Sequence, residues 1–234
     1  MTFDEVCAVS DMYQLLAKTM LLPDEALARS VLAGDVAGDA ADILRELGAG
    51  EETISDVRKA LSAPAADDGD GAAGEERRVR RLLDELRVDY TRLFTDPRKP
   101  VIMPYETVYV NGQFEQAGKE VNRSLFVSPA ATDASYRYGK VGLSVDAKIS
   151  NEPADYIFFE LSFLSLLHAK IAKCMGCDDV VGEAGLWTQA EEFERIHADR
   201  WFEGFFSTVE ENGGLFYAGV ARCYRTFRSL TRCK

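Results

Sequence analysis

The stretch PADYIFFELSFLSLLHAKIAK, residues 153–173, places large apolar side chains at helical spacing. The apolar positions are Ile157, Phe158, Leu161, Leu164 and Ile171. Pro153 is suited to the first turn of a helix, and this would put Asp155 in that turn, where a carboxylate stabilises the positive end of the helix dipole. The stretch therefore predicts a long helix with a wide buried face.

The same periodicity extends over most of the chain, which predicts an all-α fold. Thr2 and Glu5 have the spacing of a capping box at the start of the first helix. Further helices are predicted over residues 3–20, 54–61, 75–94, 130–138, 187–200, 201–211 and 215–230. The remainder of 105–150 is expected to be irregular, with Val108–Val110 extended and Asn111-Gly112 as a turn.

Residues 63–76 are small or acidic and include no large apolar side chain. Such a segment cannot bury enough surface to offset the entropy lost on ordering. We therefore expect a mobile loop at 63–76.

Composition excludes several classes of protein. Of the 234 residues, 47% are hydrophobic, which allows a sizeable core, and 28% are charged. No apolar run reaches the length of a membrane span, so we expect no membrane insertion. The net charge of −12 disfavours nucleic acid as a partner. The acidic N-terminus is unlike a secretory signal, and this favours a cytoplasmic protein.

The sequence has few residues that suggest catalysis. It contains no phosphate-binding glycine loop and no His-Glu-x-x-His pattern, and we interpret His168 and His197 as structural. Cys174 and Cys177 form a Cys-x-x-Cys pair, but they fall at the predicted C-terminal end of a helix, where the dipole disfavours a thiolate. We expect no catalytic residue, no cofactor and no metal site.

Two motifs stand out together: DYTRLFTDP at residues 89–97 followed by PYETVY at 104–109, and NEPADY at 151–156. Tyr90, Leu93 and Phe94 share one helix face, and this is typical of core packing as well as of a binding surface. An aromatic and aliphatic face beside a carboxylate suits an apolar peptide that carries basic side chains.

The pattern Tyr-x-x-Leu-Phe-x-x-Pro, Pro-Tyr-Glu-x-Val-Tyr and Glu-Pro-x-Asp resembles the TorD/DmsD/NarJ family of redox-enzyme maturation chaperones. The resemblance covers residues 89–230. It implies two helical subdomains joined by a hinge, which we place at 1–125, 126–152 and 153–234. It also implies binding to the twin-arginine signal peptide, the body, or both, of the precursor of a molybdopterin-dependent oxidoreductase of the DMSO-reductase type.

The resemblance carries over to individual residues. The implied binding residues are Tyr90, Leu93, Phe94, Pro104, Tyr105, Asp155 and Tyr156, and the motif residues with a structural role are Glu106, Glu152 and Pro153. Tyr156 stands where many relatives carry histidine. The alternatives are a helical adaptor without signal-peptide recognition and a thiol-redox enzyme that uses Cys174 and Cys177. Both a monomer and a domain-swapped homodimer are compatible with the sequence.

Overall fold

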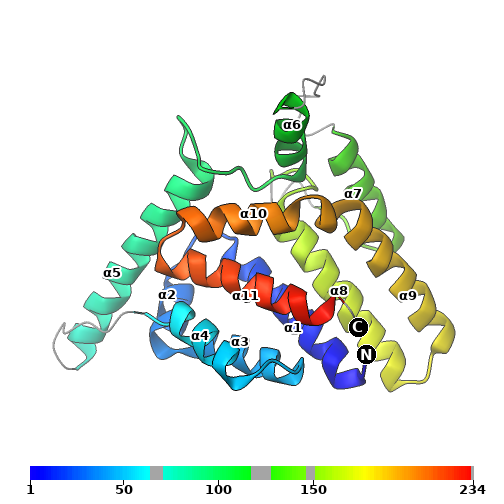
Figure 1. Cartoon of the computed structure of the whole chain (residues 1–234), viewed down its shortest axis with the longest axis horizontal. Coiled ribbons are helices and arrows are strands. Elements are labelled where there is room, and N and C mark those ends of the chain that lie inside the picture. The colour runs from blue at the N-terminus through cyan, green and yellow to red at the C-terminus, as the bar shows by residue number, and fades with distance from the viewer. Residues whose placement is uncertain (64–70, 117–127, 146–150, 233–234) are drawn as a thin grey trace. The chain divides into compact units, whose positions relative to one another are not determined.

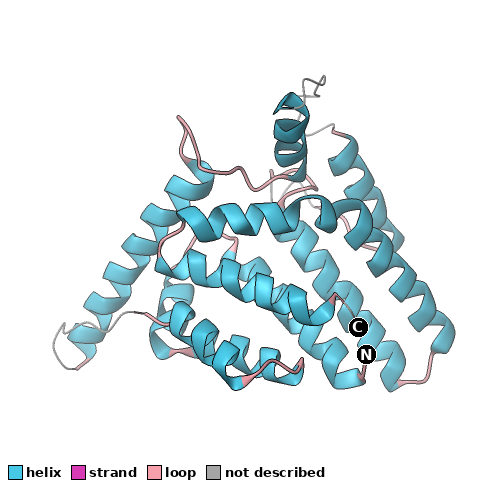
Figure 2. Ribbon diagram, viewed as in Figure 1, coloured by secondary structure: helices cyan, strands magenta, loops and turns pink. Residues whose placement is uncertain are grey.

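The structure is a computed structural model that describes residues 1–63, 71–116, 128–145 and 151–232 (Figure 1). Within these ranges the regular secondary structure is helical, and no strand is present (Figure 2). The prediction of an all-α fold is confirmed. None of the described helices is long and apolar enough to cross a membrane.

The helices follow one another with short connections. Their bounds are α1 Phe3–Thr19, α2 Glu25–Ala33, α3 Asp35–Glu46, α4 Glu51–Leu61, α5 Ala72–Tyr90, α6 Glu106–Gln116, α7 Pro129–Lys140, α8 Ile157–Gly176, α9 Val180–Phe193, α10 Asp199–Asn212 and α11 Leu215–Thr231. Two π-helical turns, Thr91–Thr95 and Glu194–Ala198, continue α5 and α9. The predicted capping box opens α1, because Thr2 and Glu5 exchange hydrogen bonds of 2.8 and 3.2 Å.

The chain forms two compact units, and each combines two segments of sequence. Unit 1 contains Met1–Ala17 and Met103–Phe205, and unit 2 contains Lys18–Ile102 and Phe206–Lys234. The boundaries of these units fall within α1, within α10 and in the connection that leads to α6. They differ from the expected division at 1–125, 126–152 and 153–234, and the hinge stays a prediction.

Unit 1 is built around α8, which packs against α9, while α6 packs against α7. The apolar face predicted for α8 is buried except at the half-buried Phe158, and Ile157, Leu161 and Leu164 are fully inaccessible to solvent. Burying such a side chain stabilises the fold by about 1.5–3 kcal/mol. Unit 1 therefore has its own core, and α8 passes through it.

In unit 2, α4 packs against both α3 and α11, and α2 packs against α5. Gly219 of α11 allows the close approach to α4, because a Cβ at this position would lie 2.5 Å from the Ala60 carbonyl oxygen. Gly34 joins α2 to α3 with φ of 84°, a conformation that favours glycine. Unit 2 therefore also has its own core.

Two predicted boundaries of the first half are wrong. Helix α5 begins at Ala72, so residues 72–76 of the expected loop are helical, while 64–70 lie outside the described residues. Helix α6 occupies a region expected to be irregular, and both Val108–Val110 and Asn111-Gly112 lie within it. The predicted helix at 130–138 is confirmed as part of α7.

Candidate functional site

The two sequence motifs lie side by side in unit 1. Tyr105 and Tyr156 form an isolated antiparallel bridge. Within it the Glu106 N–H donates to the Asp155 carbonyl at 3.0 Å, and the Ile157 N–H donates to the Pro104 carbonyl at 3.0 Å. Backbone pairing therefore holds PYETVY against NEPADY.

Asp155 does not lie in the first turn of α8, as the sequence suggested, because that helix begins at Ile157. Its carboxylate instead accepts hydrogen bonds from the Thr107 N–H at 2.9 Å and from the Thr107 hydroxyl, in the first turn of α6. Asp155 thus stabilises the positive end of α6. Burial raises the pKa of Asp155, although the bonds from Thr107 favour the ionised form.

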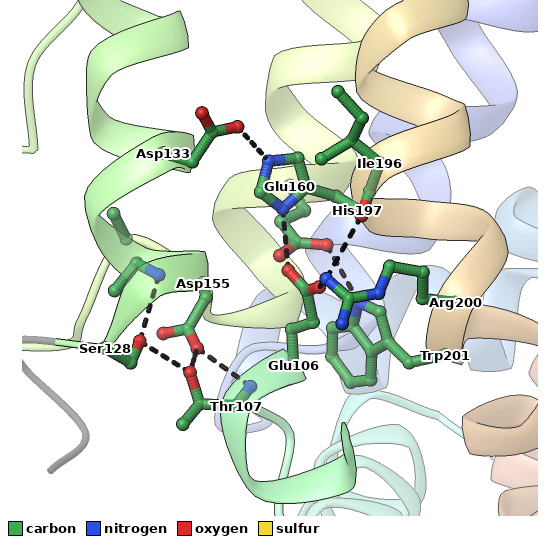
Figure 3. Close-up of polar contacts among 12 residues, drawn as sticks. Glu106, Thr107, Ser128, Asp133, Asp155, Glu160, Ile196, His197, Arg200 and Trp201 are labelled. Atoms are coloured by element: carbon green, nitrogen blue, oxygen red, sulfur yellow. Dashed lines mark hydrogen bonds and ion pairs between the residues drawn. The ribbon is translucent and has the colours of Figure 1, made fainter. Parts of the chain in front are cut away.

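The Asp155 contact extends to α7. The Thr107 hydroxyl is also hydrogen-bonded to Ser128 Oγ at 2.6 Å, and Ser128 Oγ accepts the Ala131 N–H at the start of α7 (Figure 3). Asp155, Thr107 and Ser128 are all buried. This chain of hydrogen bonds fixes the starts of α6 and α7 around one carboxylate.

A second buried network surrounds Glu106. His197 Nδ1 lies 2.6 Å from Glu106 Oε2, and His197 Nε2 lies 2.9 Å from Asp133 Oδ2. Arg200 donates to Glu106 Oε1 at 3.1 Å. Each ring nitrogen of His197 therefore faces a carboxylate oxygen. Burial alone would raise the pKa of Asp133, but hydrogen bonds from Arg137 and His197 outweigh it and lower that pKa.

Glu160 of α8 joins this network from the other side (Figure 3). It is fully buried, and its Oε2 accepts the Trp201 indole N–H at 2.9 Å. Burial, and then the negative charge of Glu106, raise the pKa of Glu160 well above its ordinary value. Burial and this neighbouring charge therefore favour the protonated form of Glu160.

The predicted binding residues Tyr90, Leu93 and Phe94 are buried in unit 2. The Tyr90 and Phe94 rings meet edge-on with centroids 5.1 Å apart, and Phe94 meets Tyr217 of α11 at 5.6 Å. The Tyr90 hydroxyl donates to the Met20 carbonyl at 3.3 Å. These three motif residues form part of the core of unit 2.

Their neighbours in the same motif hold the turn between α10 and α11. Asp89 Oδ2 accepts the Gly214 N–H at 2.6 Å. Arg92 donates to the Asn212 carbonyl at 2.5 Å and to Asp89 Oδ1 at 2.5 Å. Asp89 and Arg92 were not predicted as site residues, although both are charged and lie within DYTRLFTDP.

Among the selected residues of unit 1, Pro104, Pro153 and Tyr156 are buried as well, whereas Tyr105 is half-buried and Glu152 is exposed. The Tyr105 hydroxyl donates to Glu152 Oε2 at 2.6 Å. The Tyr105 ring lies 5.6 Å from that of Tyr156.

Two half-buried aromatic rings extend this group. Phe159 meets Tyr156 edge-on at 5.8 Å and meets Phe158 at 5.4 Å. Together with Tyr105 and Glu152, these rings form an aromatic surface with one carboxylate, which we call the Tyr105–Glu152 surface. Its members are Tyr105, Glu152, Phe158 and Phe159, and the buried Tyr156 ring lies beneath them.

The cysteine pair lies where it was predicted, in the last turn of α8, with Cys177 as its C-cap. Desolvation and the nearby Asp179 carboxylate raise the pKa of the Cys174 thiol. A thiol with a raised pKa carries less of the reactive thiolate. The local electrostatics therefore disfavour redox chemistry by Cys174.

Comparison with known families gives one match. A family model described as nitrate reductase delta subunit matches residues 53–207, which include both motifs and all the residues of the two buried networks. None of the curated proteins matches the chain.

Proposed function

Because the chain belongs to the nitrate reductase delta subunit family, whose members are chaperones for the maturation of molybdoenzymes, we propose that it binds the precursor of a molybdopterin-dependent oxidoreductase in the cytoplasm. The proposed contact is with the twin-arginine leader of the precursor, its body, or both. The observation that carries the proposal is the family match across 53–207, which spans PYETVY and NEPADY.

We place leader recognition on the Tyr105–Glu152 surface. A twin-arginine leader combines two guanidinium groups with an apolar segment. Guanidinium groups stack on aromatic faces and form charge-assisted hydrogen bonds with carboxylates. Tyr105, Phe158 and Phe159 supply partly exposed rings, and Glu152 supplies an exposed carboxylate beside them.

The buried motif residues have a different role in this proposal. Asp155 is inaccessible to solvent and is bonded to Thr107, so it positions α6 and the backbone of Tyr105. Tyr90, Leu93 and Phe94 stabilise unit 2 through their burial. We therefore assign recognition to side chains at the surface and positioning to those in the interior.

The function is tested by isothermal titration of the full chain with a leader peptide from the molybdoenzyme precursor encoded nearest to its gene. We expect saturable binding with one peptide per chain. The matched control is the same peptide with both arginines replaced by alanine, which should bind at least tenfold more weakly. Equal binding of the two peptides would favour the adaptor alternative. Binding to the client enzyme without its leader, and no binding to the leader peptide, would assign recognition to the body.

A further inference from the structure

In the network around Glu106, the side chains of His197 and Glu106 are each held by a hydrogen bond to an outer partner. His197 Nε2 is fixed by Asp133 at 2.9 Å, and Glu106 Oε1 is fixed by Arg200 at 3.1 Å. The remaining ring nitrogen, His197 Nδ1, lies 2.6 Å from the remaining carboxylate oxygen, Glu106 Oε2 (Figure 3). A carboxylate behind an imidazole is the outer-shell arrangement that orients metal-ligating histidines.

Glu160 completes the group with an unpartnered oxygen. Its Oε2 is fixed by Trp201 at 2.9 Å, while its buried Oε1 has no hydrogen-bond partner among the described residues. Leaving a buried polar atom without a partner is costly, and such atoms in native proteins usually mark an unobserved water or ion. Figure 3 shows the Glu160 carboxyl group directed toward Glu106 and His197.

The distances suit a small cation. One ligand atom each from Glu106, Glu160 and His197 lies within 4.8 Å of the other two. Ligands at about 2.0–2.2 Å from a tetrahedral ion are roughly 3.4 Å apart. The His197 and Glu106 atoms, now 2.6 Å apart, would therefore have to move apart slightly to admit an ion. All three residues are buried.

We propose that Glu106, Glu160 and His197 form a buried binding site for one divalent transition-metal ion. One imidazole nitrogen with two carboxylate oxygens is a ligand set for Zn²⁺, Mn²⁺ or Fe²⁺. Asp133 and Arg200 are the outer partners of His197 and Glu106, and Trp201 is that of Glu160. This differs from our expectation from sequence that no metal site exists.

The three proposed ligands lie behind a partly exposed pair of outer partners. Asp133 and Arg200 are partly exposed, with 39% and 43% of their side chains accessible, and they border the ligands on the solvent side. Because the three ligands themselves are buried, we expect the ion to enter readily during folding and slowly afterwards.

The test uses the full chain with both Cys174 and Cys177 replaced by serine, which removes the Cys-x-x-Cys pair as a competing zinc site. The protein is unfolded in denaturant with a chelator, refolded with Zn²⁺ or Mn²⁺, and dialysed before elemental analysis and thermal melting. We expect about one retained ion per chain and a higher Tm than in protein refolded without metal.

Two matched variants decide the outcome. Glu160→Gln keeps an acceptor for Trp201 but replaces the third ligand, so it should lower the retained metal at least tenfold while remaining folded. Glu191→Gln removes an exposed carboxylate of unit 1 and should retain as much metal as the parent. No retained metal in the parent, or equal retention by Glu160→Gln, would overturn the proposal and leave a proton shared between Glu160 and Glu106.

Discussion

Replacing Glu160 with glutamine should make the free energy of unfolding less sensitive to pH. Glutamine has nearly the shape of a neutral glutamic acid, can accept the Trp201 N–H and can donate to Glu106. It therefore imitates the protonated side chain that burial favours, but it cannot ionise. The substitution isolates one titration with little change in packing.

The sign of the effect follows from the direction of the pKa shift. Burial and the charge of Glu106 raise the pKa of Glu160 in the folded state, whereas in the unfolded chain it is about 4.3. The wild-type stability from this group is fully present below about pH 4.3 and is lost as pH rises through the folded pKa. The free energy of unfolding of the wild type falls by up to about 1.4 kcal/mol per pH unit from this group. Over two pH units, the difference in unfolding free energy between wild type and variant would therefore change by up to about 2.7 kcal/mol.

The assay is urea unfolding of both proteins at pH 5, 6, 7 and 8 with a chelator present to exclude metal. The difference in unfolding free energy, Glu160→Gln minus wild type, should increase with pH. Glu191→Gln serves as the exposed control and should follow the wild type at every pH. A difference that stays constant between pH 5 and 8 would refute the assignment of a neutral, buried Glu160.

Three further predictions concern stability and the thiols. Gly219→Ala should destabilise the chain by about 1–3 kcal/mol in urea unfolding, because its Cβ would meet the carbonyl of α4 at 2.5 Å. Gly185→Ala has no atom within 4 Å of its Cβ and should be stabilising by up to about 1 kcal/mol; destabilisation equal to that of Gly219→Ala would contradict the packing described. Leu93→Ala should lower the free energy of unfolding by about 2–5 kcal/mol, because it leaves a cavity in unit 2. If the variant lost leader binding but kept its stability, Leu93 would be a binding residue. Replacing Cys174 and Cys177 with serine should leave leader binding unchanged in calorimetry, and a folded variant that fails to support maturation of the client would revive the thiol-redox alternative.

Local periodicity was sufficient to predict the fold class and the long helix α8. It failed at α6, because Val108–Val110 and Asn111-Gly112 have weak local preference for helix. The start of that helix is stabilised by the Asp155 carboxylate, which comes from 48 residues further along the chain. A contact of this kind leaves no signal in the local sequence.

The role of the candidate site stays a prediction. The structure places PYETVY beside NEPADY, but the sequence did not distinguish the exposed Glu152 from the buried Asp155. Glu160 was passed over, although it stands three residues after Ile157 and four before Leu164 on the apolar face of α8. A carboxyl group in the middle of a buried stripe is a signal that could have identified it. His197 was interpreted as structural, and its two carboxylate partners became visible only in the fold.

The most direct measurement is the leader affinity of Glu152→Gln. This variant keeps an acceptor for the Tyr105 hydroxyl but removes an exposed negative charge from the Tyr105–Glu152 surface. Losing a hydrogen bond to a charged group costs about 1.5–3 kcal/mol, so calorimetry should give an affinity weaker by roughly 10- to 150-fold, at unchanged Tm. Glu191→Gln should bind the leader as the wild type does. Equal affinity of folded Glu152→Gln and wild type would contradict the claim that this surface recognises the leader.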